Sequence, residues 1–417
     1  MPDCSTTRRG FFGAATLPLI ASAGLGTTTG EAAPSNVAAQ PIPVTKITNV
    51  ETFLLKTTLK RPFGVSVSVP LDRTRSTLLI KIETDSGHVG WGETAPVSGA
   101  RGAIIDQLVP KLIGQNPLEY RKIWRSLWGA NFGHALAVGG VDIALQDLRG
   151  HLLNLPVAEL HGGRFRDRVM AYGSTMNYLE GAEPETLYPQ QATELVQAGY
   201  RALKMRLGRY PVSREAKVAQ AVREAVGPDV RLMVDGNAGY TLGSALKMGE
   251  ALQDLNFDFF EEPLPQSPKY TGYEELRRKL ALPLAGGEGL DSRASAKDLI
   301  DRQAVHILQP DISLCGGFSE VLFIAEMAAL SGMPCLPHCW GSAILIAATT
   351  HLVALLPEPH WGLPTDSPML EYDLSENPWR TEIVEHPLLV ENGSVLVPTT
   401  PGLGIKVRED VVRQYAI

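Results

Sequence analysis

RLMVD at 231–235, FDFFE at 257–261 and LPLAGGE at 282–288 are the stretches that decide the fold of this chain. Each is a short apolar run that ends in a carboxylate, and each is followed by a loop and a stretch long enough for a helix. Short apolar runs that alternate with helical stretches predict parallel strands joined by helices.

The same alternation extends in both directions along the chain. Eight strands with helices between them predict an α/β fold of the (β/α) barrel, or TIM, type over residues 166–370. Two of the clearest helical stretches are residues 213–226 and 319–330. The remaining apolar runs are at 169–172, 202–205, 305–308, 334–336 and, more weakly, 360–363.

A different pattern precedes the barrel. Residues 44–55 and 76–84 have the alternation and β-branched content of strands, with a loop at 60–75 between them, and residues 102–160 are helical in pattern. An α+β capping module is therefore expected over residues 44–165. The segment 371–417, with a turn at Glu391-Asn392-Gly393-Ser394, is expected to return to this module and complete it.

Composition excludes several classes of partner and site. The chain has 417 residues and a net charge of −7, so it lacks the basic excess needed to bind nucleic acid or an anionic membrane surface. Its four cysteines form no Cys-x-x-Cys pair, which argues against a zinc or redox motif. Cys315, Cys335 and Cys339 lie in apolar stretches and are expected to be buried thiols.

The first 43 residues are typical of a signal and linker. A pair of arginines, Arg8 and Arg9, precedes an apolar run at 14–26 that is too short to span a bilayer, as in a twin-arginine export signal. Residues 24–43 are rich in Thr, Ala, Gly and Pro, which indicates a linker. We therefore expect an exported, periplasmic protein with no membrane segment in its mature form.

The carboxylates at the strand ends predict a metal site. Glu261 follows Asp235 by 26 residues, and Glu288 follows Glu261 by 27 residues. One strand–helix unit per step places all three side chains on the same rim, where the active sites of barrels lie. A single carboxylate there would more often be a solvated loop residue or a helix cap. Three together repel one another unless a cation lies between them, and an all-oxygen ligand set favours one Mg²⁺ per subunit, or Mn²⁺.

The next two strand ends indicate a base. His338 alone would more often be a structural histidine, but Asp311 ends the preceding strand, 27 residues earlier. A carboxylate beside an imidazole fixes its tautomer and raises its basicity, so the two are predicted to form a catalytic dyad.

Further polar residues are expected at the same rim. Lys204 and Arg206 end the second strand, and Asn237 follows Asp235; all three are predicted to contact substrate. Glu371 is expected after the eighth strand, either as a protonated donor to a substrate carboxylate or as an ordinary surface acid. Lys204, Arg206 and Glu371 are also predicted to take part in catalysis.

At these residues the chain resembles the enolase superfamily, and within it the mandelate racemase subgroup, over residues 45–410. The resemblance implies a modified (β/α)₇β barrel with an N-terminal α+β cap, loops at 60–75 and 94–101 that cover the substrate, and a homo-oligomer. Residues 315–320 and 371–380 also resemble D-galactarolactone cycloisomerases and related acid-sugar enzymes. The motifs that carry the resemblance are Gly90-Trp91-Gly92-Glu93, residues 142–150, Val234-Asp235-Gly236-Asn237, Phe260-Glu261-Glu262-Pro263, Gly286-Gly287-Glu288, Gln309-Pro310-Asp311 and Pro401-Gly402-Leu403-Gly404.

One departure from the family pattern bears on the reaction. Many members carry Lys-x-Lys where this chain has Lys204-Met205-Arg206, and an arginine is almost always protonated and therefore a poor base. The chain also has no lysine between Lys297 and Lys406, which excludes the muconate-lactonising arrangement. A racemase needs a base on each face of the substrate, so chemistry with one base, His338, fits better.

The function expected from this layout is that of a Mg²⁺-dependent lyase. It would abstract the α-proton of a sugar acid through an enediolate and eliminate the β-substituent, as an acid-sugar dehydratase does. A cycloisomerase of a sugar-acid lactone or anhydro-sugar acid uses the same first steps and remains an alternative. A racemase or epimerase, and a non-catalytic exported metalloprotein that binds carboxylates, also remain open.

Overall fold

A computed structural model of the protein describes residues 44–129, 133–266, 270–358 and 367–417, and the structural statements below refer to these. The expected export signal, its linker and Cys4 lie outside the described residues and stay predictions, as does the homo-oligomer.

An antiparallel sheet forms one part of the capping module. β1 (Ile47–Gly64), β2 (Asp72–Thr84) and β3 (Val89–Thr94) lie in the order β3-β2-β1, and the short β5 (Tyr178–Leu179) is added at the edge of β1. β1 and β2 reach further than expected, so the loop predicted at 60–75 is shortened to residues 65–71. The cause is long-range pairing, because Phe63 pairs with both Asp72 and Leu179.

Helices cover this sheet, and α4 (Ala135–Leu153) is almost entirely buried against β3. Glycine is required at this contact. A Cβ atom on Gly90 would lie 2.2 Å from the Ala144 carbonyl oxygen, and one on Gly92 would lie 2.1 Å from that of Gly140. The other helical elements of the cap are α1 (Ala100–Ala103), a π-helical turn (Ile104–Leu108), α2 (Val109–Leu112), α3 (Tyr120–Trp128) and α5 (Val157–Leu160).

The second sheet is of the TIM-barrel type, and the strands that follow one another in it are parallel. Its strands lie in the order β10-β9-β8-β7-β6-β4-β11. Cys335 forms a parallel bridge with Leu308 of β10, and this short extended segment takes the place of the seventh barrel strand. Counting the segment at Cys335 as the seventh strand, seven strand–helix units followed by β11 give the (β/α)₇β order that the family resemblance implies. The strands are β4 (Arg168–Ser174), β6 (Ala202–Arg206), β7 (Arg231–Asp235), β8 (Phe259–Glu261), β9 (Leu284–Gly286), β10 (Ile307–Leu308) and β11 (Leu370–Asp373).

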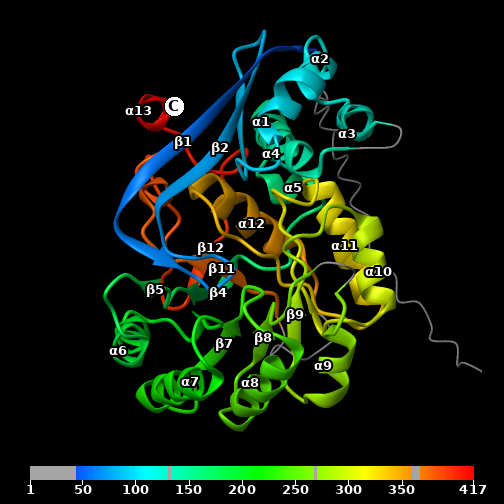
Figure 1. Ribbon diagram of the computed structural model, residues 1–417. Coiled ribbons are helices and arrows are strands. Elements are labelled where there is room, and N and C mark those ends of the chain that lie inside the picture. The colour runs from blue at the N-terminus through cyan, green and yellow to red at the C-terminus, as the bar shows by residue number, and fades with distance from the viewer. Residues whose placement is uncertain (1–43, 130–132, 267–269, 359–366) are drawn as a thin grey trace, which may run out of the picture. The chain divides into compact units, whose positions relative to one another are not determined.

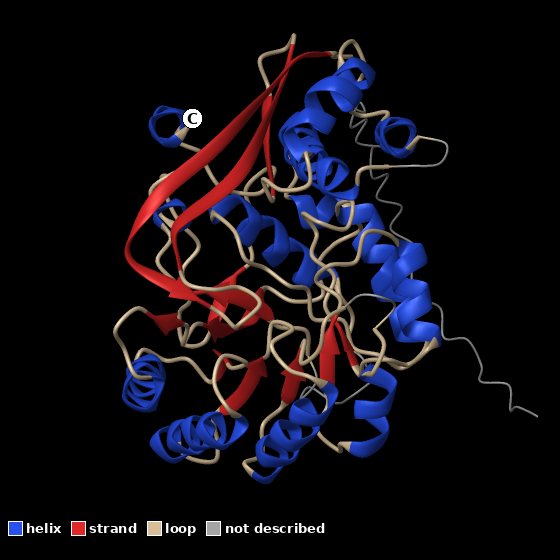
Figure 2. Cartoon of the chain, viewed as in Figure 1, coloured by secondary structure: helices blue, strands red, loops and turns tan. Residues whose placement is uncertain are grey.

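A helix follows each of the first seven strand positions of the barrel. Figure 1 shows α7, α8 and α9 on the outside of β7, β8 and β9, and Figure 2 shows the same separation of helix and strand. α12 is buried along its whole length and contacts β3 of the cap as well as β4 and β11 of the barrel. The barrel helices are α6 (Pro184–Gln197), α7 (Val212–Val226), α8 (Leu242–Asp254), α9 (Tyr273–Lys279), α10 (Arg293–Asp301), α11 (Phe318–Leu330) and α12 (Ala343–Leu355).

The eighth strand differs from the expectation. The apolar run at 360–363 lies outside the described residues, and the position beside β4 is taken by β11, whose four residues all pair with β4. The boundary expected between residues 370 and 371 therefore falls inside a strand, and Glu371 lies within β11 rather than after it.

The C-terminal segment returns to both modules. The turn predicted at 391–394 is confirmed, because Glu391 and Ser394 exchange backbone hydrogen bonds of 2.8 and 3.1 Å. It leads into β12 (Ser394–Leu396), which pairs with β4. A 3₁₀ turn (Pro378–Arg380) precedes it, and α13 (Glu409–Tyr415) packs on β1. None of the helices in the described ranges combines the length and apolar character needed to cross a bilayer.

Candidate active site

The three carboxylates predicted to bind metal lie together. Asp235 and Glu261 are the last residues of β7 and β8 and are register partners, and Glu288 follows β9. One carboxylate oxygen from each lies within 4.8 Å of the others. The regular spacing of these residues in the sequence thus places their carboxylate oxygens together at the carboxyl ends of neighbouring parallel strands.

The chemistry of this cluster fits a hard divalent cation. All three donors are carboxylates, which Mg²⁺ and Mn²⁺ prefer. Oε2 of Glu288 is buried and, within the described chain, has no hydrogen-bond partner. Burial raises the pKa of Glu288; the nearby charge of Glu261 raises it further, while His338 opposes the change. A buried carboxylate oxygen with no hydrogen-bond donor is suited to bind a cation.

A buried lysine lies among the same carboxylates. Nζ of Lys204 is 2.7 Å from Oε1 of Glu261 and 3.6 Å from Oδ2 of Asp235. It is also 2.7 Å from Oε1 of Glu371, and the lysine side chain is fully buried. Lys204 therefore holds two predicted metal ligands and Glu371 around one ammonium group.

Glu371 is not a surface acid. The residue is fully buried, and its Oε2 accepts a hydrogen bond of 3.2 Å from the backbone of Cys339. Burial by itself would raise its pKa, but the positive charges of Lys204, His338 and Arg206 outweigh burial and lower the pKa. The surface reading is thus wrong, because the side chain is buried. The lowered pKa favours an ionised carboxylate, because Lys204 and Arg206, which come from distant parts of the chain, lie beside it.

Arg206 supports the loop that follows β7. Its guanidinium donates to the Asp235 carboxylate, and it donates further hydrogen bonds of 3.1 Å to Oδ1 of Asn237 and to Oγ of Ser174. The backbone N–H of Asn237 donates to Oδ1 of Asp235 at 2.8 Å. Nε of Arg206 is buried and has no hydrogen-bond partner in the described part of the chain.

The predicted dyad is assembled. Nδ1 of His338 lies 2.7 Å from Oδ2 of Asp311, and since an ionised carboxylate only accepts, this nitrogen carries the hydrogen. Nε2 then faces Oε2 of Glu288 at 3.5 Å. Burial lowers the pKa of His338, but the charges of Glu288, Glu371 and Asp311 together outweigh it and raise the pKa to about 10.

The capping module makes contacts with the barrel that the sequence did not identify. In its 65–71 loop, Ser66 donates to the carbonyl of Asn237 at 2.9 Å, and Ser68 to that of Ala238 at 3.0 Å. Arg75 pairs with Asp373 at 2.6 Å and lies over the ring of Trp340 at 4.3 Å. No local pattern signals these contacts, since each joins residues far apart in the chain.

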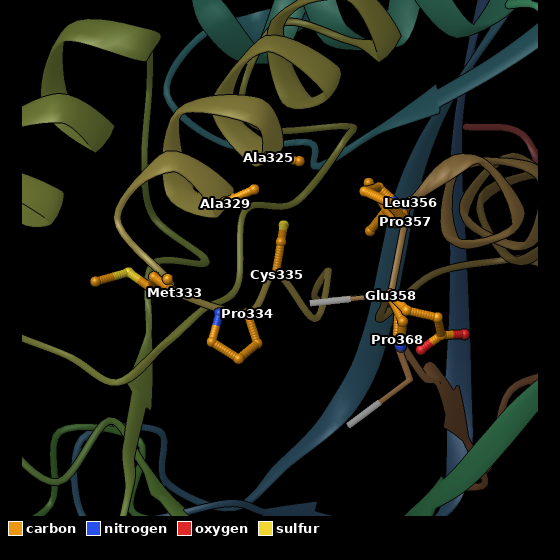
Figure 3. A pocket seen from close by; sticks show the side chains of 10 residues that line it. Ala325, Ala329, Met333, Pro334, Cys335, Leu356, Pro357, Glu358 and Pro368 are labelled. Atoms are coloured by element: carbon orange, nitrogen blue, oxygen red, sulfur yellow. The ribbon is translucent and has the colours of Figure 1, made fainter. Parts of the chain in front are cut away.

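A small cavity elsewhere in the barrel takes no part in this site. It has a volume of about 30 Å³ and lies between α11, the bridge at Cys335 and the chain after α12. Figure 3 shows that its wall is mostly apolar, with Glu358 as the single charged side chain among those drawn. None of the predicted site residues lines it.

Comparisons with known proteins agree with this geometry. Residues 47–162 match the mandelate racemase/muconate lactonizing enzyme N-terminal domain, and residues 188–411 match the enolase C-terminal domain-like family.

Individual relatives match most of the chain. A D-galactarolactone cycloisomerase of Agrobacterium fabrum is 37% identical over 89% of this chain and 98% of its own length. An arabinonate dehydratase of Saccharolobus solfataricus is 32% identical over 80% of this chain and 89% of its own. The crystal structure of a 3,6-anhydro-D-galactonate cycloisomerase from Zobellia galactanivorans superposes with a TM-score of 0.79 at 32% identity, covering 89% of this chain and 99% of that one.

Proposed function

Since this chain belongs to the mandelate racemase/muconate lactonizing enzyme family of the enolase superfamily, we propose that it removes the α-proton of a sugar acid and then expels the substituent on the β-carbon. One observation carries the proposal: the His338–Asp311 dyad lies against the carboxylate cluster, with Nε2 of His338 3.5 Å from Glu288. A base beside a cation site is what enolisation of a carboxylate requires.

Asp235, Glu261 and Glu288 would hold the divalent cation, which supplies positive charge to an enediolate when it is bound. Nε2 of His338 would accept the α-proton, while Asp311 retains the hydrogen on Nδ1 and so fixes the tautomer. Among the three charges that raise the pKa of His338, Glu288 has the largest effect. A cation bound to Glu288 would neutralise this charge and bring the pKa of His338 down toward the range in which a neutral imidazole is available.

The groups on the other strands support elimination rather than racemisation. Lys204 is fully buried with its ammonium held by Glu261 and Glu371, and Arg206 is engaged by Asp235 and Asn237. Both cationic groups are thus engaged by carboxylates, an arrangement that does not favour either as a base on a second face of the substrate. One base therefore takes the α-proton, and the electron pair left on the α-carbon expels the β-oxygen.

The leaving group separates two candidate reactions. In dehydration the β-hydroxyl leaves as water, and protonated His338 can return the proton that it needs. This is the reaction that we propose first, and it agrees with dehydratases among the relatives at 30–33% identity. Cycloisomerisation is the second candidate because the 37% identical relative carries that name. There the ring oxygen of a lactone leaves as a carboxylate, which needs no proton.

Proton exchange in D₂O tests the shared step. The full-length protein with Mg²⁺ is incubated with arabinonate, D-xylonate, D-galactonate, D-galactarolactone and 3,6-anhydro-D-galactonate, and NMR follows deuterium at the α-carbon and the products. We expect turnover of at least one of these, abolished by His338→Asn. His88→Asn, in the cap hairpin, is the matched control and should leave turnover unchanged.

The product identifies the reaction. Loss of the β-hydroxyl with formation of a 2-keto-3-deoxy acid supports dehydration, and an opened ring with the same atom count supports cycloisomerisation. Deuterium at an inverted α-carbon with the β-oxygen retained would show a racemase and contradict the one-base scheme. Exchange in wild type that survives His338→Asn would contradict the proposed base.

A further inference from the structure

We propose that Glu93 and Thr94, at the end of β3 in the capping module, are positioning residues for the His338–Asp311 base. The inference rests on the proposed function, since it assigns to the cap a role in proton abstraction besides that of covering the substrate. Both barrel loops that carry the dyad are bonded to these two neighbouring residues.

The first connection reaches Asp311 through Ser313. Thr94 Oγ1 donates a hydrogen bond of 2.9 Å to the carbonyl oxygen of Ser313. The backbone N–H and the hydroxyl of Ser313 both donate to Oδ1 of Asp311 at 2.7 Å, and Oδ2 of Asp311 accepts from Nδ1 of His338 at 2.7 Å. Thr94, Ser313 and Asp311 are all buried, so no water competes for these bonds.

The second connection reaches the loop of His338. Oε1 of Glu93 accepts from the backbone N–H of Ser342 at 2.8 Å, and Oε2 accepts from the Ser342 hydroxyl at 2.5 Å and from the N–H of Leu345 at 3.0 Å. Thr77, on β2, donates to Oε1 at 2.7 Å. Ser342, which caps α12 and follows His338 by four residues, is therefore bound to a carboxylate of the cap sheet.

Close backbone contact makes this arrangement stiff. A Cβ atom on Gly139 of α4 would lie 2.4 Å from the carbonyl oxygen of Ser313, and one on Gly140 would lie 3.0 Å from Cβ of Thr94. Only a helix without side chains at these positions can pack this closely against both Thr94 and the Asp311 loop. A shift of the cap relative to the barrel therefore moves both members of the dyad.

Loss of these contacts should affect the rate of proton transfer rather than the affinity for substrate. In the described residues, Glu93 and Thr94 contact the loops of the base rather than the carboxylate cluster, so their loss should impair proton transfer more than binding. Misplacement of a reacting group by a fraction of an ångström to 1 Å can lower a rate by up to about 10²-fold.

A threonine series separates positioning from stability. Thr94→Val removes the hydroxyl at nearly constant shape, Thr94→Ser keeps it, and Thr84→Val is the matched control. Thr84 is also a buried cap threonine, and it donates to a backbone carbonyl, that of His88, at 3.2 Å within the hairpin. With the five compounds named above, we expect Thr94→Val to lower kcat about tenfold with KM within about twofold. Thr94→Ser and Thr84→Val should resemble wild type. Equal kcat in Thr94→Val and Thr84→Val would overturn the inference.

A spectroscopic measurement keeps this test independent of the proposed function. The proton between Nδ1 of His338 and Asp311 should give a low-field ¹H NMR resonance in the Mg²⁺-supplemented full-length protein, identified by its loss in His338→Asn. We expect this resonance to shift in Thr94→Val and to stay in place in Thr84→Val. An unmoved resonance in Thr94→Val refutes positioning even if the enzyme is active. A shifted resonance in a protein that exchanges no α-proton would support positioning while refuting the proposed reaction.

Discussion

Asp142 should make the stability of this protein fall as the pH rises through neutrality. This residue of α4 is fully buried, accepts a hydrogen bond from Tyr120, and accepts another of 2.7 Å from the N–H of Phe318, at the start of α11. Burial raises its pKa from 3.8 to about 7, and the hydrogen bonds only partly offset this. The folded state therefore binds a proton that the unfolded state has already released at pH 5 to 7.

The sign and size of the effect follow from linkage. A group whose pKa is higher in the folded state stabilises below its unfolded pKa, and that stability is lost as pH rises to the folded pKa. With about 1.4 kcal/mol per pKa unit, the whole effect is on the order of 4 kcal/mol, of which about 2.5 kcal/mol falls between pH 5 and pH 8.

Denaturant unfolding of wild type and Asp142→Asn over this pH range measures the difference. Asparagine cannot titrate, so the stability of wild type relative to the variant should decline by about 2.5 kcal/mol from pH 5 to pH 8. Asp106→Asn, on the exposed side of the π-helical turn, controls for the loss of one charge from the cap. A difference that is flat within about 0.5 kcal/mol, or that grows with pH, would refute the reasoning.

Three further changes probe the site and the cap. Glu288→Gln should weaken Mg²⁺ binding at least about tenfold in calorimetry, because it removes one of three anionic ligands; unchanged affinity would place the metal elsewhere. Lys204→Met leaves buried Glu261 without its cation, so metal-free unfolding free energy should fall by about 3–5 kcal/mol, and a loss below about 1 kcal/mol would contradict this. Gly92→Ala forces a Cβ to 2.1 Å from a carbonyl oxygen and should destabilise by about 1–3 kcal/mol or more, whereas Gly243→Ala, with open space around it, should change stability by less than about 0.5 kcal/mol.

The barrel could be predicted well because its signal repeats locally. Each strand of a (β/α) unit is buried on both faces and reads as an apolar run, and its polar end residue faces the rim whatever the rest of the fold does. This is why Asp235, Glu261 and Glu288 could be brought to one place from spacing alone. The weak apolar run at 360–363 did not locate the eighth strand. That strand is β11, which is identified by its pairing with β4.

The sequence by itself therefore determined the strand–helix order, the carboxylate cluster and the Asp311–His338 pair, since these depend on position within a repeating unit. Only the tertiary structure decided the burial of Glu371 and its cationic surroundings, because these depend on Lys204 and Arg206 lying within 4 Å of it. The same holds for the cap. Arg75 reaches Asp373 across 298 residues, and Thr94 reaches Ser313 across 219. Such contacts form where two modules meet, and their energies depend on distances between side chains that no local periodicity encodes.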